Sequence, residues 1–351
     1  MSDATAALQQ AVKQASADRS PLQLHGSDSK GFYGNTVQGQ ALDLKQHQGI
    51  VSYEPTELVL TARCGTSLQE VEALLRENGQ YLSFDPPRFQ GQGTLGGAIA
   101  AGLGGPGRPW GGAPRDVLLG VKLLDGKGQI LRFGGEVMKN VAGYDVSRLM
   151  AGALGTLGIL LEVSLKVLPR PLERDTLVLE MNRARAIARL RELCRQAIPV
   201  DGACHYNGQL YLRLSGSHAS IKAWRQRIGG ESLAEHSTFW QRLRDHDLSH
   251  FRKQGTLWRL SLPPATATLA CEQDSLLDWA GAQRWLMSSL PAAQIRAQVG
   301  ISGGHAEVFR RGPDQTAPFQ AMSEPLLALH RRLKQRFDPD GILNPGRLFD
   351  A

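Results

Sequence analysis

Closely spaced cysteines are absent from this sequence. Its four cysteines, Cys64, Cys194, Cys204 and Cys271, include no C-x-x-C pair. Zinc sites and iron–sulfur clusters are usually built from such pairs, and disulfide scaffolds belong to much shorter chains. The sequence therefore predicts no metal site, no iron–sulfur cluster and no disulfide-based fold.

Long apolar runs are also absent. The most apolar stretch, residues 155–168, contains Glu162 and Lys166 and is too short to cross a bilayer as a helix. The N-terminal segment is polar and lacks the apolar centre of a signal peptide. These two observations predict a cytoplasmic protein.

Aromatic residues are few, at 6% of the chain, and no block of lysines and arginines is interleaved with them. Nucleic-acid binding is therefore not expected, although the formal net charge is +7. Many basic residues stand beside acidic ones, as in residues 173–175 and 242–247. A phosphate-bearing ligand or an acidic partner surface explains the charge equally well.

Glycine, in contrast, is abundant, with 39 residues among 351. A chain of this length suggests two domains, and the glycine density falls near residue 170, where Pro169 and Pro171 suggest a boundary. Before that boundary, glycine-rich turns alternate with short apolar segments that we expect to be strands. These expected strands are residues 58–62, 117–124 and 160–168.

The second part of the chain has a different pattern. Apolar and polar residues alternate as they do in half-buried antiparallel strands. The alternating segments are residues 176–180, 209–214 and 257–262. We therefore predict a small antiparallel sheet backed by helices, and the sequence shows no internal repeat.

Four segments have the features of helices. Ser67 to Glu70 form a capping box, and Asn78-Gly79 ends the apolar pattern that follows, which indicates a surface helix with a structural role. Helical periodicity also occurs over residues 184–194, after Ser217, and over residues 323–337. The tail beyond the last helix is rich in proline and glycine, and we expect it to pack back onto the protein.

One glycine motif is misleading. Residues 91–96 match the dinucleotide fingerprint G-x-G-x-x-G, and Asp116 follows at a suitable distance. The fingerprint requires a strand that runs directly into the first glycine. Pro86 and Pro87 stand where that strand would have to be, and consecutive prolines do not fit a central strand. The sequence therefore argues against a Rossmann fold.

Three separate glycine clusters remain, at residues 25–34, 93–102 and 152–159. Successive backbone amides in such turns can bind an anion, and nearby serine or threonine hydroxyls add hydrogen-bond donors. Each cluster alone is better explained as an ordinary tight turn between strands.

Taken in order, these clusters and the segments between them resemble the FAD-binding domain of the vanillyl-alcohol oxidase/PCMH flavoprotein family. The resemblance covers residues 20–170 and 337–349 and includes the closing Asn344-Pro345-Gly346. Within the family, residues 139–145 and the short second half are most similar to the FAD-binding (E) subunits of bacterial glycolate oxidases.

The resemblance implies an α+β protein with three parts. A PCMH-type FAD-binding domain of two α/β subdomains would occupy residues 1–170. An inserted cap domain, made of an antiparallel sheet and helices, would occupy residues 171–322. Residues 323–351 would form a C-terminal helix and a tail that return to the FAD domain.

The resemblance also implies which residues contact FAD. The pyrophosphate loop would be Gly26, Ser27, Asp28, Ser29, Lys30 and Gly31. A second cradle, beside the ring and the ribityl chain, would be Pro87, Gly93, Thr94, Leu95, Gly96, Gly97 and Ala100. Lys139, Asn140, Tyr144 and Asp145 would line the adenine or flavin side. The entry to a strand near the flavin would be Gly152, Gly155, Thr156, Gly158 and Ile159, and Asn344 would close over the ring. Because His25 lies outside the loop motif, we expect FAD to be bound non-covalently.

Catalytic residues are harder to find. Relatives that oxidise 2-hydroxy acids usually place histidines and a carboxylate over the flavin, and the expected H-x-H motif is absent. His305, with Glu307 two residues later, is the best candidate for a base, and an ordinary surface histidine is the alternative. His246 and His250 have metal-ligand spacing but no third ligand, so we interpret them as a solvated face. His205 is a further candidate.

The resemblance implies the FAD-carrying subunit of a glycolate oxidase, which oxidises glycolate, a small 2-hydroxy acid, to glyoxylate. Its partners would be a second flavoprotein (D) subunit and an iron–sulfur subunit, with at most peripheral membrane association through them. Two alternatives stay open. One is a stand-alone FAD-dependent D-2-hydroxy-acid dehydrogenase of the D-lactate type, and the other is a non-catalytic structural or regulatory flavin-binding subunit.

Overall fold

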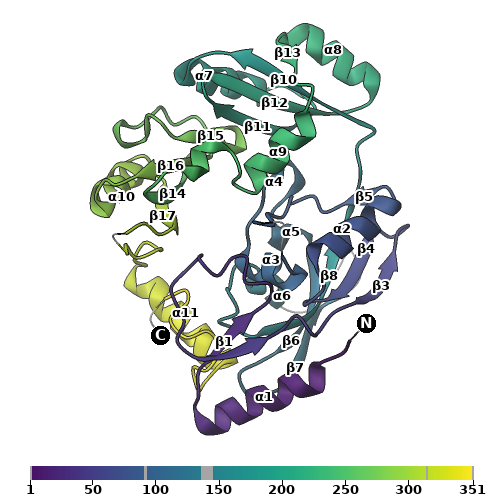
Figure 1. The fold of residues 1–351 in the computed structure, drawn as a ribbon, viewed down its shortest axis with the longest axis vertical. Coiled ribbons are helices and arrows are strands. Elements are labelled where there is room, and N and C mark those ends of the chain that lie inside the picture. Colours follow the sequence, from purple (N-terminus) through teal and green to yellow (C-terminus); the bar gives the residue numbers. More distant parts are fainter. Residues whose placement is uncertain (1, 91–92, 136–144, 314, 350–351) are drawn as a thin grey trace. The chain divides into compact units, whose positions relative to one another are not determined.

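The computed structural model describes residues 2–90, 93–135, 145–313 and 315–349 (Figure 1). The contacts within the chain divide it into two compact units. The first unit comprises Met1–Gly104, Gly112–Pro169 and Ala321–Ala351, and the second comprises Gly105–Gly111 and Arg170–Gln320. Apart from the short segment Gly105–Gly111, these divisions lie within two residues of the expected boundaries after residues 170 and 322.

The first unit is built on a five-stranded sheet in the order β3-β4-β8-β6-β7. Its strands are β3 (Ile50–Glu54), β4 (Val59–Arg63), β6 (Leu118–Leu124), β7 (Ile130–Gly134) and β8 (Ile159–Lys166). All of the neighbouring strands run antiparallel. A Rossmann sheet is mostly parallel, so this topology agrees with the argument against that fold.

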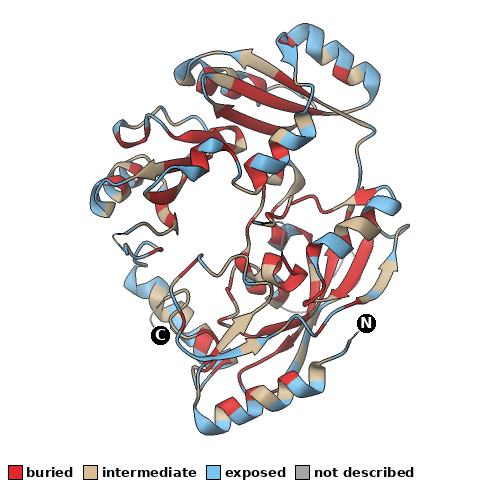
Figure 2. Cartoon of the chain, in the orientation of Figure 1, coloured by how far each residue is buried: buried red, intermediate tan, exposed pale blue. Residues whose placement is uncertain are grey.

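Two apolar clusters stabilise this sheet. Helices α2 (Leu68–Glu77) and α3 (Leu95–Ala101) contribute to a cluster with β4, β6 and β8. Helix α1 (Thr5–Asp18) packs in another cluster with β8 and with Ile342 and Leu343 of the tail. Figure 2 shows the buried residues concentrated on the sheet and on the inner faces of these helices. The tail therefore packs onto the first unit.

Short elements complete the first unit and the segment Gly105–Gly111. They are β1 (Leu22–His25), β2 (Gln40–Asp43), β5 (Gln80–Tyr81), α4 (Arg108–Gly111), α5 (Pro114–Val117), α6 (Val146–Met150), β9 (Leu168–Pro169) and α11 (Glu324–Phe337). Strands β1 and β2 pair in parallel, and β5 pairs antiparallel with β9. Among the described residues, no helix is both long and apolar enough to span a membrane.

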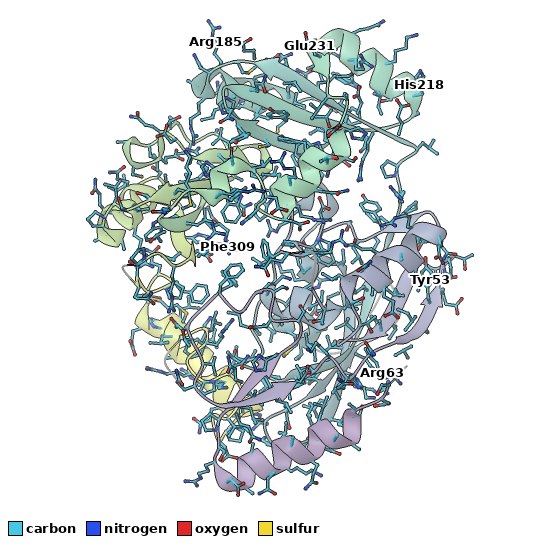
Figure 3. All side chains as sticks on the ribbon, viewed as in Figure 1. Tyr53, Arg63, Arg185, His218, Glu231 and Phe309 are labelled. Atoms are coloured by element: carbon cyan, nitrogen blue, oxygen red, sulfur yellow. The ribbon has the colours of Figure 1, made fainter. Side chains whose placement is uncertain are left out.

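The second unit contains an eight-stranded antiparallel sheet in the order β13-β10-β12-β11-β15-β16-β14-β17. Its strands are β10 (Glu173–Glu180), β11 (Val200–Tyr206), β12 (Gln209–Gly216), β13 (Glu231–Ser232), β14 (Thr256–Ser261), β15 (Leu276–Asp278), β16 (Gln283–Ser288) and β17 (His305–Arg310). Its helices are α7 (Arg183–Leu193), α8 (His218–Ile228), α9 (His236–Arg244) and α10 (Ala292–Ile301), with the 3-10 turns η1 (Ser249–Arg252), η2 (Ala270–Glu272) and η3 (Trp279–Gly281). Figure 3 shows Arg185 of α7 and His218 of α8 projecting outward from these helices.

The order of these strands has a repeat that the amino-acid sequence does not show. The first half has the order β10-α7-β11-β12-α8-β13, which is a β-α-β-β-α-β unit. The second half runs β14-β15-β16-α10-β17 along the chain, with the turn η2 in place of the first helix. Within the sheet its strands have the order β15-β16-β14-β17, which is the reverse of the equivalent order β13-β10-β12-β11 in the first half. The repeat is therefore visible in the strand order and not in the amino-acid sequence.

The segment Gly105–Gly111 belongs to the second unit because Trp279 holds it there. The indole Nε1 of Trp279 donates to the carbonyl of Gly105 at 2.9 Å. The Arg108 guanidinium lies 4.4 Å from the centre of the Trp279 ring, in a cation–π contact. The glycine pattern placed this segment in the first domain, since nothing in the sequence pairs it with a tryptophan so distant along the chain.

A buried carboxyl supports the turn that carries Trp279. Trp279 and Ala280 both have left-handed backbones, with φ values of 51° and 54°, which is unfavourable for residues with a side chain. The Asp278 carboxylate accepts a hydrogen bond from the Trp279 amide at 2.8 Å and another from Gln283 Nε2 at 3.2 Å. Burial raises the pKa of Asp278 from 3.8 to about 7, despite these hydrogen bonds.

Asp278→Asn is expected to remove one component of the pH dependence of stability. Because the pKa is higher in the folded state, the stability due to Asp278 is fully present below pH 4 and is lost as the pH rises through about 7. Between pH 5 and pH 8, the wild type should lose about 3 kcal/mol more stability than the variant. Thermal unfolding at pH 5 and pH 8 would measure this difference. Parallel curves for the two proteins would contradict this account.

Candidate functional site

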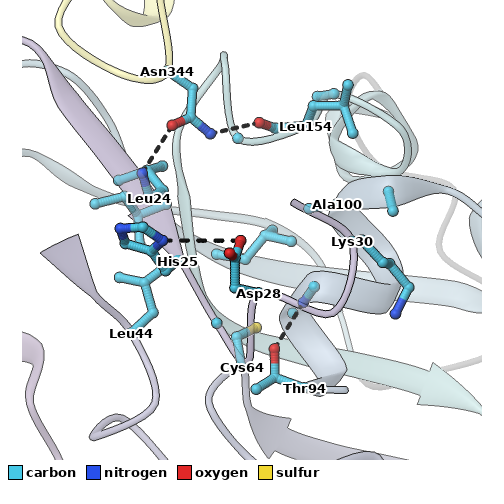
Figure 4. A pocket seen from close by; sticks show the side chains of 18 of the residues that line it. Leu24, His25, Asp28, Lys30, Leu44, Cys64, Thr94, Ala100, Leu154 and Asn344 are labelled. Carbon is cyan, nitrogen blue, oxygen red and sulfur yellow. Dashed lines mark hydrogen bonds and ion pairs between the residues drawn. The ribbon is translucent and has the colours of Figure 1, made fainter. Parts of the chain in front are cut away.

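The three glycine clusters and the tail meet around one pocket in the first unit (Figure 4). The lining from the first cluster is His25, Gly26, Ser27, Asp28, Ser29, Lys30 and Gly31. The second contributes Thr94, Gly96, Gly97, Ala100 and Ala101, and the third Ala153, Leu154, Gly155, Gly158 and Ile159. Leu24, Leu44, Cys64, Met150, Leu160, Asn344 and Arg347 complete the wall. Segments far apart in the sequence therefore form one continuous surface.

The first loop lies directly against the start of the second. A Cβ added at Gly26 would stand 2.4 Å from the Thr94 hydroxyl oxygen, so a side chain at this position would force the two loops apart. Thr94 caps helix α3 by accepting a hydrogen bond from the Gly97 amide at 3.2 Å. Gly96 allows the same helix to approach β4, because its added Cβ would lie 2.5 Å from Cβ of Cys64. These glycines are required by close backbone packing.

The third loop needs glycine for its backbone conformation. Gly152 and Gly155 have φ values of +88° and +73°, which only glycine adopts without strain. The Gly152 amide donates to the Ile99 carbonyl at 3.1 Å, and the Leu154 amide donates to the Ala100 carbonyl at 2.9 Å. The loop is therefore hydrogen-bonded along helix α3, and the pocket runs beside their junction.

Asn344 links the tail to the pocket wall (Figure 4). Its Oδ1 accepts from the Leu24 amide at 2.8 Å, and its Nδ2 donates to the Leu154 carbonyl at 2.8 Å. One buried side chain thus connects β1 to the third loop. These two hydrogen bonds to the backbone give Asn344 a structural role in the pocket wall.

Lys334 of α11 connects the tail to the third loop. Its ammonium donates to the Thr156 carbonyl at 2.9 Å, the Leu343 carbonyl at 2.7 Å and the Asp338 carboxylate at 2.5 Å. Burial lowers the pKa of Lys334, and the neighbouring Asp338 carboxylate acts in the opposite direction. Three hydrogen bonds thereby connect α11, the tail and the third loop.

The first loop carries positive charge beside its backbone amides. Lys30 lies in the loop, and the Arg347 guanidinium donates to the carbonyls of Lys30 at 3.3 Å and Gly31 at 3.1 Å. Asp28 is the acidic residue in the lining, and its Oδ1 lies 4.0 Å from Nδ1 of His25. An anionic group suits this end of the pocket, while the glycine, alanine and leucine surfaces suit a flat apolar group.

Several expected contacts do not line the pocket. Pro87 and Leu95 are buried, and Gly93 packs against Leu68. Gly152 supports the third loop through its hydrogen bond to Ile99 and is not among the lining residues. The Thr156 hydroxyl donates inward to the Ala153 carbonyl at 2.7 Å. Asp145 caps α6 and forms an ion pair with Arg148 at 2.9 Å. Lys139, Asn140 and Tyr144 lie outside the described residues.

Cys64 and Arg347 are lining residues that the sequence did not indicate. Cys64 follows an apolar strand and looks like an ordinary core residue, and burial raises the pKa of its thiol far above the usual range. Arg347 directly follows Asn344-Pro345-Gly346, and this position after a tail motif could have suggested it.

The candidate base His305 lies on the edge strand β17 of the second unit, and its side chain is 60% exposed. Its Nε2 is 3.7 Å from Oε1 of Glu307, so the two side chains do share a face. Glu307 also accepts two hydrogen bonds from Arg259, at 2.8 and 2.9 Å. These contacts form an ion-pair cluster in which His305 is exposed and Arg259 and Glu307 are mostly buried. A catalytic role for His305 stays a prediction.

The interpretation of His246 and His250 as a solvated face is wrong. His246 follows the end of α9 with φ of 59°, and its ring stacks on Phe251 at 4.0 Å within a cluster of aromatic rings. His250 lies in η1 and is 4% exposed. The two are not on one helix, because the turn after α9 interrupts the pattern. Within the described ranges, no group of three or more His, Cys, Asp or Glu residues could hold a metal ion.

Comparison with known proteins identifies the family. Residues 3–134 match the family model of the FAD binding domain, and residues 315–348 match that of the C-terminal domain of FAD linked oxidases. The chain is 47% identical to glycolate oxidase subunit GlcE of Escherichia coli K12 over 347 residues, which cover 99% of this chain and 98% of the relative. The chain belongs to the GlcE family. Its cofactor is FAD.

Other relatives of this GlcE-family chain share only part of it or only the fold. Glycolate oxidase subunit GlcD of Bacillus subtilis is 32% identical over 46% of this chain and 35% of its own length. The structure of p-cresol methylhydroxylase superposes with a TM-score of 0.70 at 15% identity, covering 98% of this chain and 87% of that one. Alkyldihydroxyacetonephosphate synthase superposes with a TM-score of 0.70 at 14% identity, covering 97% and 75%. The expected PCMH-type α+β fold is confirmed.

Proposed function

We propose that this chain is the FAD-carrying subunit of a glycolate oxidase, which oxidises a small 2-hydroxy acid, glycolate, to glyoxylate. The observation that carries the proposal is the 47% identity with a glycolate oxidase subunit along nearly the whole of both chains. The pocket supports it, because three glycine loops and the tail form one wall that suits a ligand with an anionic centre and a flat apolar part.

Each part of the pocket has a role in holding the cofactor. The amides of the first loop, with Lys30 and Arg347, would hold the pyrophosphate. Gly97, Ala100 and Gly155 would let the backbone approach the rest of the molecule, since larger side chains would fill the space. Bound FAD supplies the acceptor for the two electrons that glycolate loses, and the protein supplies binding and orientation.

We also propose the partners. A second flavoprotein of the GlcD type and an iron–sulfur subunit would complete the enzyme, and any contact with the inner face of a membrane would be made through them. The relative named GlcD supports the former. The latter is supported by the cysteine spacing of this sequence, which offers no cluster to carry electrons onward.

An anaerobic spectrum tests this assignment. The purified chain, loaded with FAD and mixed with glycolate or D-lactate, is expected to keep the absorbance of oxidised flavin. Reduction should begin only when the partner subunits are added. Bleaching by the isolated chain would instead favour the alternative of a stand-alone D-2-hydroxy-acid dehydrogenase.

FAD is expected to leave the protein on acid denaturation. His25 does line the pocket, with a half-buried side chain. It precedes the loop glycines and lies beside Asp28, at the end of the pocket that suits the pyrophosphate rather than the ring. The precipitated protein should be colourless and the supernatant yellow. A yellow pellet would show a covalent bond, and His25→Ala would then report whether this residue forms it.

A further inference from the structure

The second unit contains a cavity of about 240 Å³ that the proposed function does not use. It lies at the end of β11, beside the start of α7, the turn η1 and the segment before β15. Among its lining residues are His205, Tyr206, Arg183, Ser249, His250 and Lys253. None of the residues that line the FAD pocket takes part.

Two neutral imidazoles face this cavity. His205 and His250 are 6% and 4% exposed. Each donates its Nε2 hydrogen to a backbone carbonyl, His205 to Met181 at 3.0 Å and His250 to Trp285 at 2.8 Å. A carbonyl can only accept, so the hydrogen of each ring is on Nε2 and the Nδ1 lone pair is an acceptor. Among the described residues, neither Nδ1 has a hydrogen-bond partner of its own.

Burial keeps both rings neutral. It lowers the pKa of His205, and it lowers the pKa of His250 to about 4. The positive charges of Arg183 and Lys253 act in the same direction on His250, while Asp274 opposes them. At pH 7 the cavity therefore offers two nitrogen acceptors, which call for hydroxyl or N–H donors on a ligand.

The wall of the cavity carries positive charge. Arg183 donates to Glu272 at 2.8 Å and to the Ser275 hydroxyl at 2.6 Å, while its buried Nε has no hydrogen-bond partner in the described part of the chain. Glu272 is also paired with the buried Arg284. Among the lining residues, Arg183 and Lys253 carry two positive charges and Asp274 carries one negative charge, which leaves a net charge of +1. The Glu272–Arg284 pair does not line the cavity and is neutral as a pair.

A hydroxyl pair completes the surface. The Tyr206 hydroxyl and the Ser249 hydroxyl are hydrogen-bonded at 2.5 Å, and both residues line the cavity. Pockets for drug-sized ligands have volumes of roughly 300–1,000 Å³, so a small molecule is enough to fill this cavity. Its chemistry requires an anionic group and at least one hydrogen-bond donor on the same small ligand.

We propose that this cavity binds a small hydroxycarboxylate, with the carboxylate directed to Lys253 and Arg183 and the hydroxyl donating to Nδ1 of His205 or His250. The site is a binding site and requires no electron transfer. Its existence does not depend on the proposed function, because no residue of the FAD pocket contributes.

Calorimetry with the purified, FAD-loaded chain tests the proposal, with glycolate as the probe. Acetate, which lacks the hydroxyl, and ethylene glycol, which lacks the charge, are the comparison ligands. Glycolate is expected to bind at least about tenfold more tightly than either. In protein labelled with ¹⁵N at histidine, glycolate should shift the Nδ1 signals of His205 and His250.

Variants connect the binding to the cavity. Lys253→Met changes an exposed side chain at the mouth and should weaken glycolate binding about tenfold. Lys222→Met changes another exposed lysine, on α8 and outside the cavity; it is the matched control and should not alter glycolate binding. Equal affinity for acetate, or binding that is insensitive to Lys253→Met, would overturn the proposal. Failure of glycolate to bind at millimolar concentration would also overturn it, whatever the isolated chain does in the anaerobic spectrum.

Discussion

Gly155→Val is expected to abolish FAD binding while leaving the fold intact. Gly155 has φ of +73°, a conformation that costs a branched side chain about 1–3 kcal/mol. The added Cβ would lie 2.9 Å from Nδ2 of Asn344 and 3.0 Å from Leu24 Cδ1. The wall would have to open at the point where Asn344 joins β1 to the third loop, and the affinity for FAD should fall at least about hundredfold. Flavin absorbance per polypeptide, with circular dichroism for folding, measures the effect.

Gly79→Val is the matched control for this variant. Gly79 has nearly the same backbone conformation, with φ of +65°, and an added Cβ would meet nothing within 4 Å. The control therefore has the backbone strain without the contact with Asn344, and it should retain FAD. If both variants lose FAD equally, general destabilisation is the cause and the role of Gly155 in the wall is wrong.

The same variant separates a catalytic from a structural role for the subunit. When Gly155→Val is assembled with the partner subunits, turnover of glycolate should fall in proportion to the FAD lost from this chain. Unchanged turnover would favour the alternative of a structural flavin-binding subunit.

Local features of the fold were predictable from the sequence, because each depends on neighbouring residues. The capping box at Ser67 predicts helix α2, and the Ser67 hydroxyl does accept from the Glu70 amide at 3.1 Å. Ser217 likewise caps α8. The alternating segment at 209–214 forms β12, which extends two residues further. Capping hydrogen bonds span only three or four residues, and a strand alternates every second residue, so both can be recognised from the local sequence.

Features that depend on distant partners were not predictable. Gly105–Gly111 joins the second unit through Trp279, and Arg347 lines the proposed FAD pocket by bonding to the first loop from the far end of the chain. His246 was expected on a solvated face because its spacing from His250 suggested one helix and no third metal ligand was evident, yet it stacks on Phe251. For the proposed FAD pocket, the loops could be found from their glycines and the family resemblance. The apolar wall around Cys64 could not, since such residues occur in every core.

Lys334→Met is expected to destabilise the protein and to weaken FAD binding together. Lys334 is a buried cation whose ammonium donates to three acceptors, so methionine, with similar length and no donor, leaves them unpaired. The main cost is the Asp338 carboxylate, which is 1% exposed and would keep only the amides of Ile342 and Leu343. Removing one partner of a buried ion pair costs about 3–5 kcal/mol. Chemical unfolding, monitored by circular dichroism, measures this loss.

The effect on FAD follows from the path between Lys334 and the pocket. Lys334 holds the carbonyl of Leu343, and the next residue is Asn344, which joins β1 to the third loop. FAD affinity should therefore fall about tenfold even under conditions in which the variant is fully folded. Adding Asp338→Asn should restore part of the stability, because it removes the unpaired charge. FAD affinity should stay low, because the hydrogen bond from Lys334 to the Leu343 carbonyl of the tail is still missing. Arg336→Met, an exposed change on the same helix, should alter neither quantity. A Lys334→Met protein with normal FAD affinity would show that the tail holds Asn344 in place without this cation.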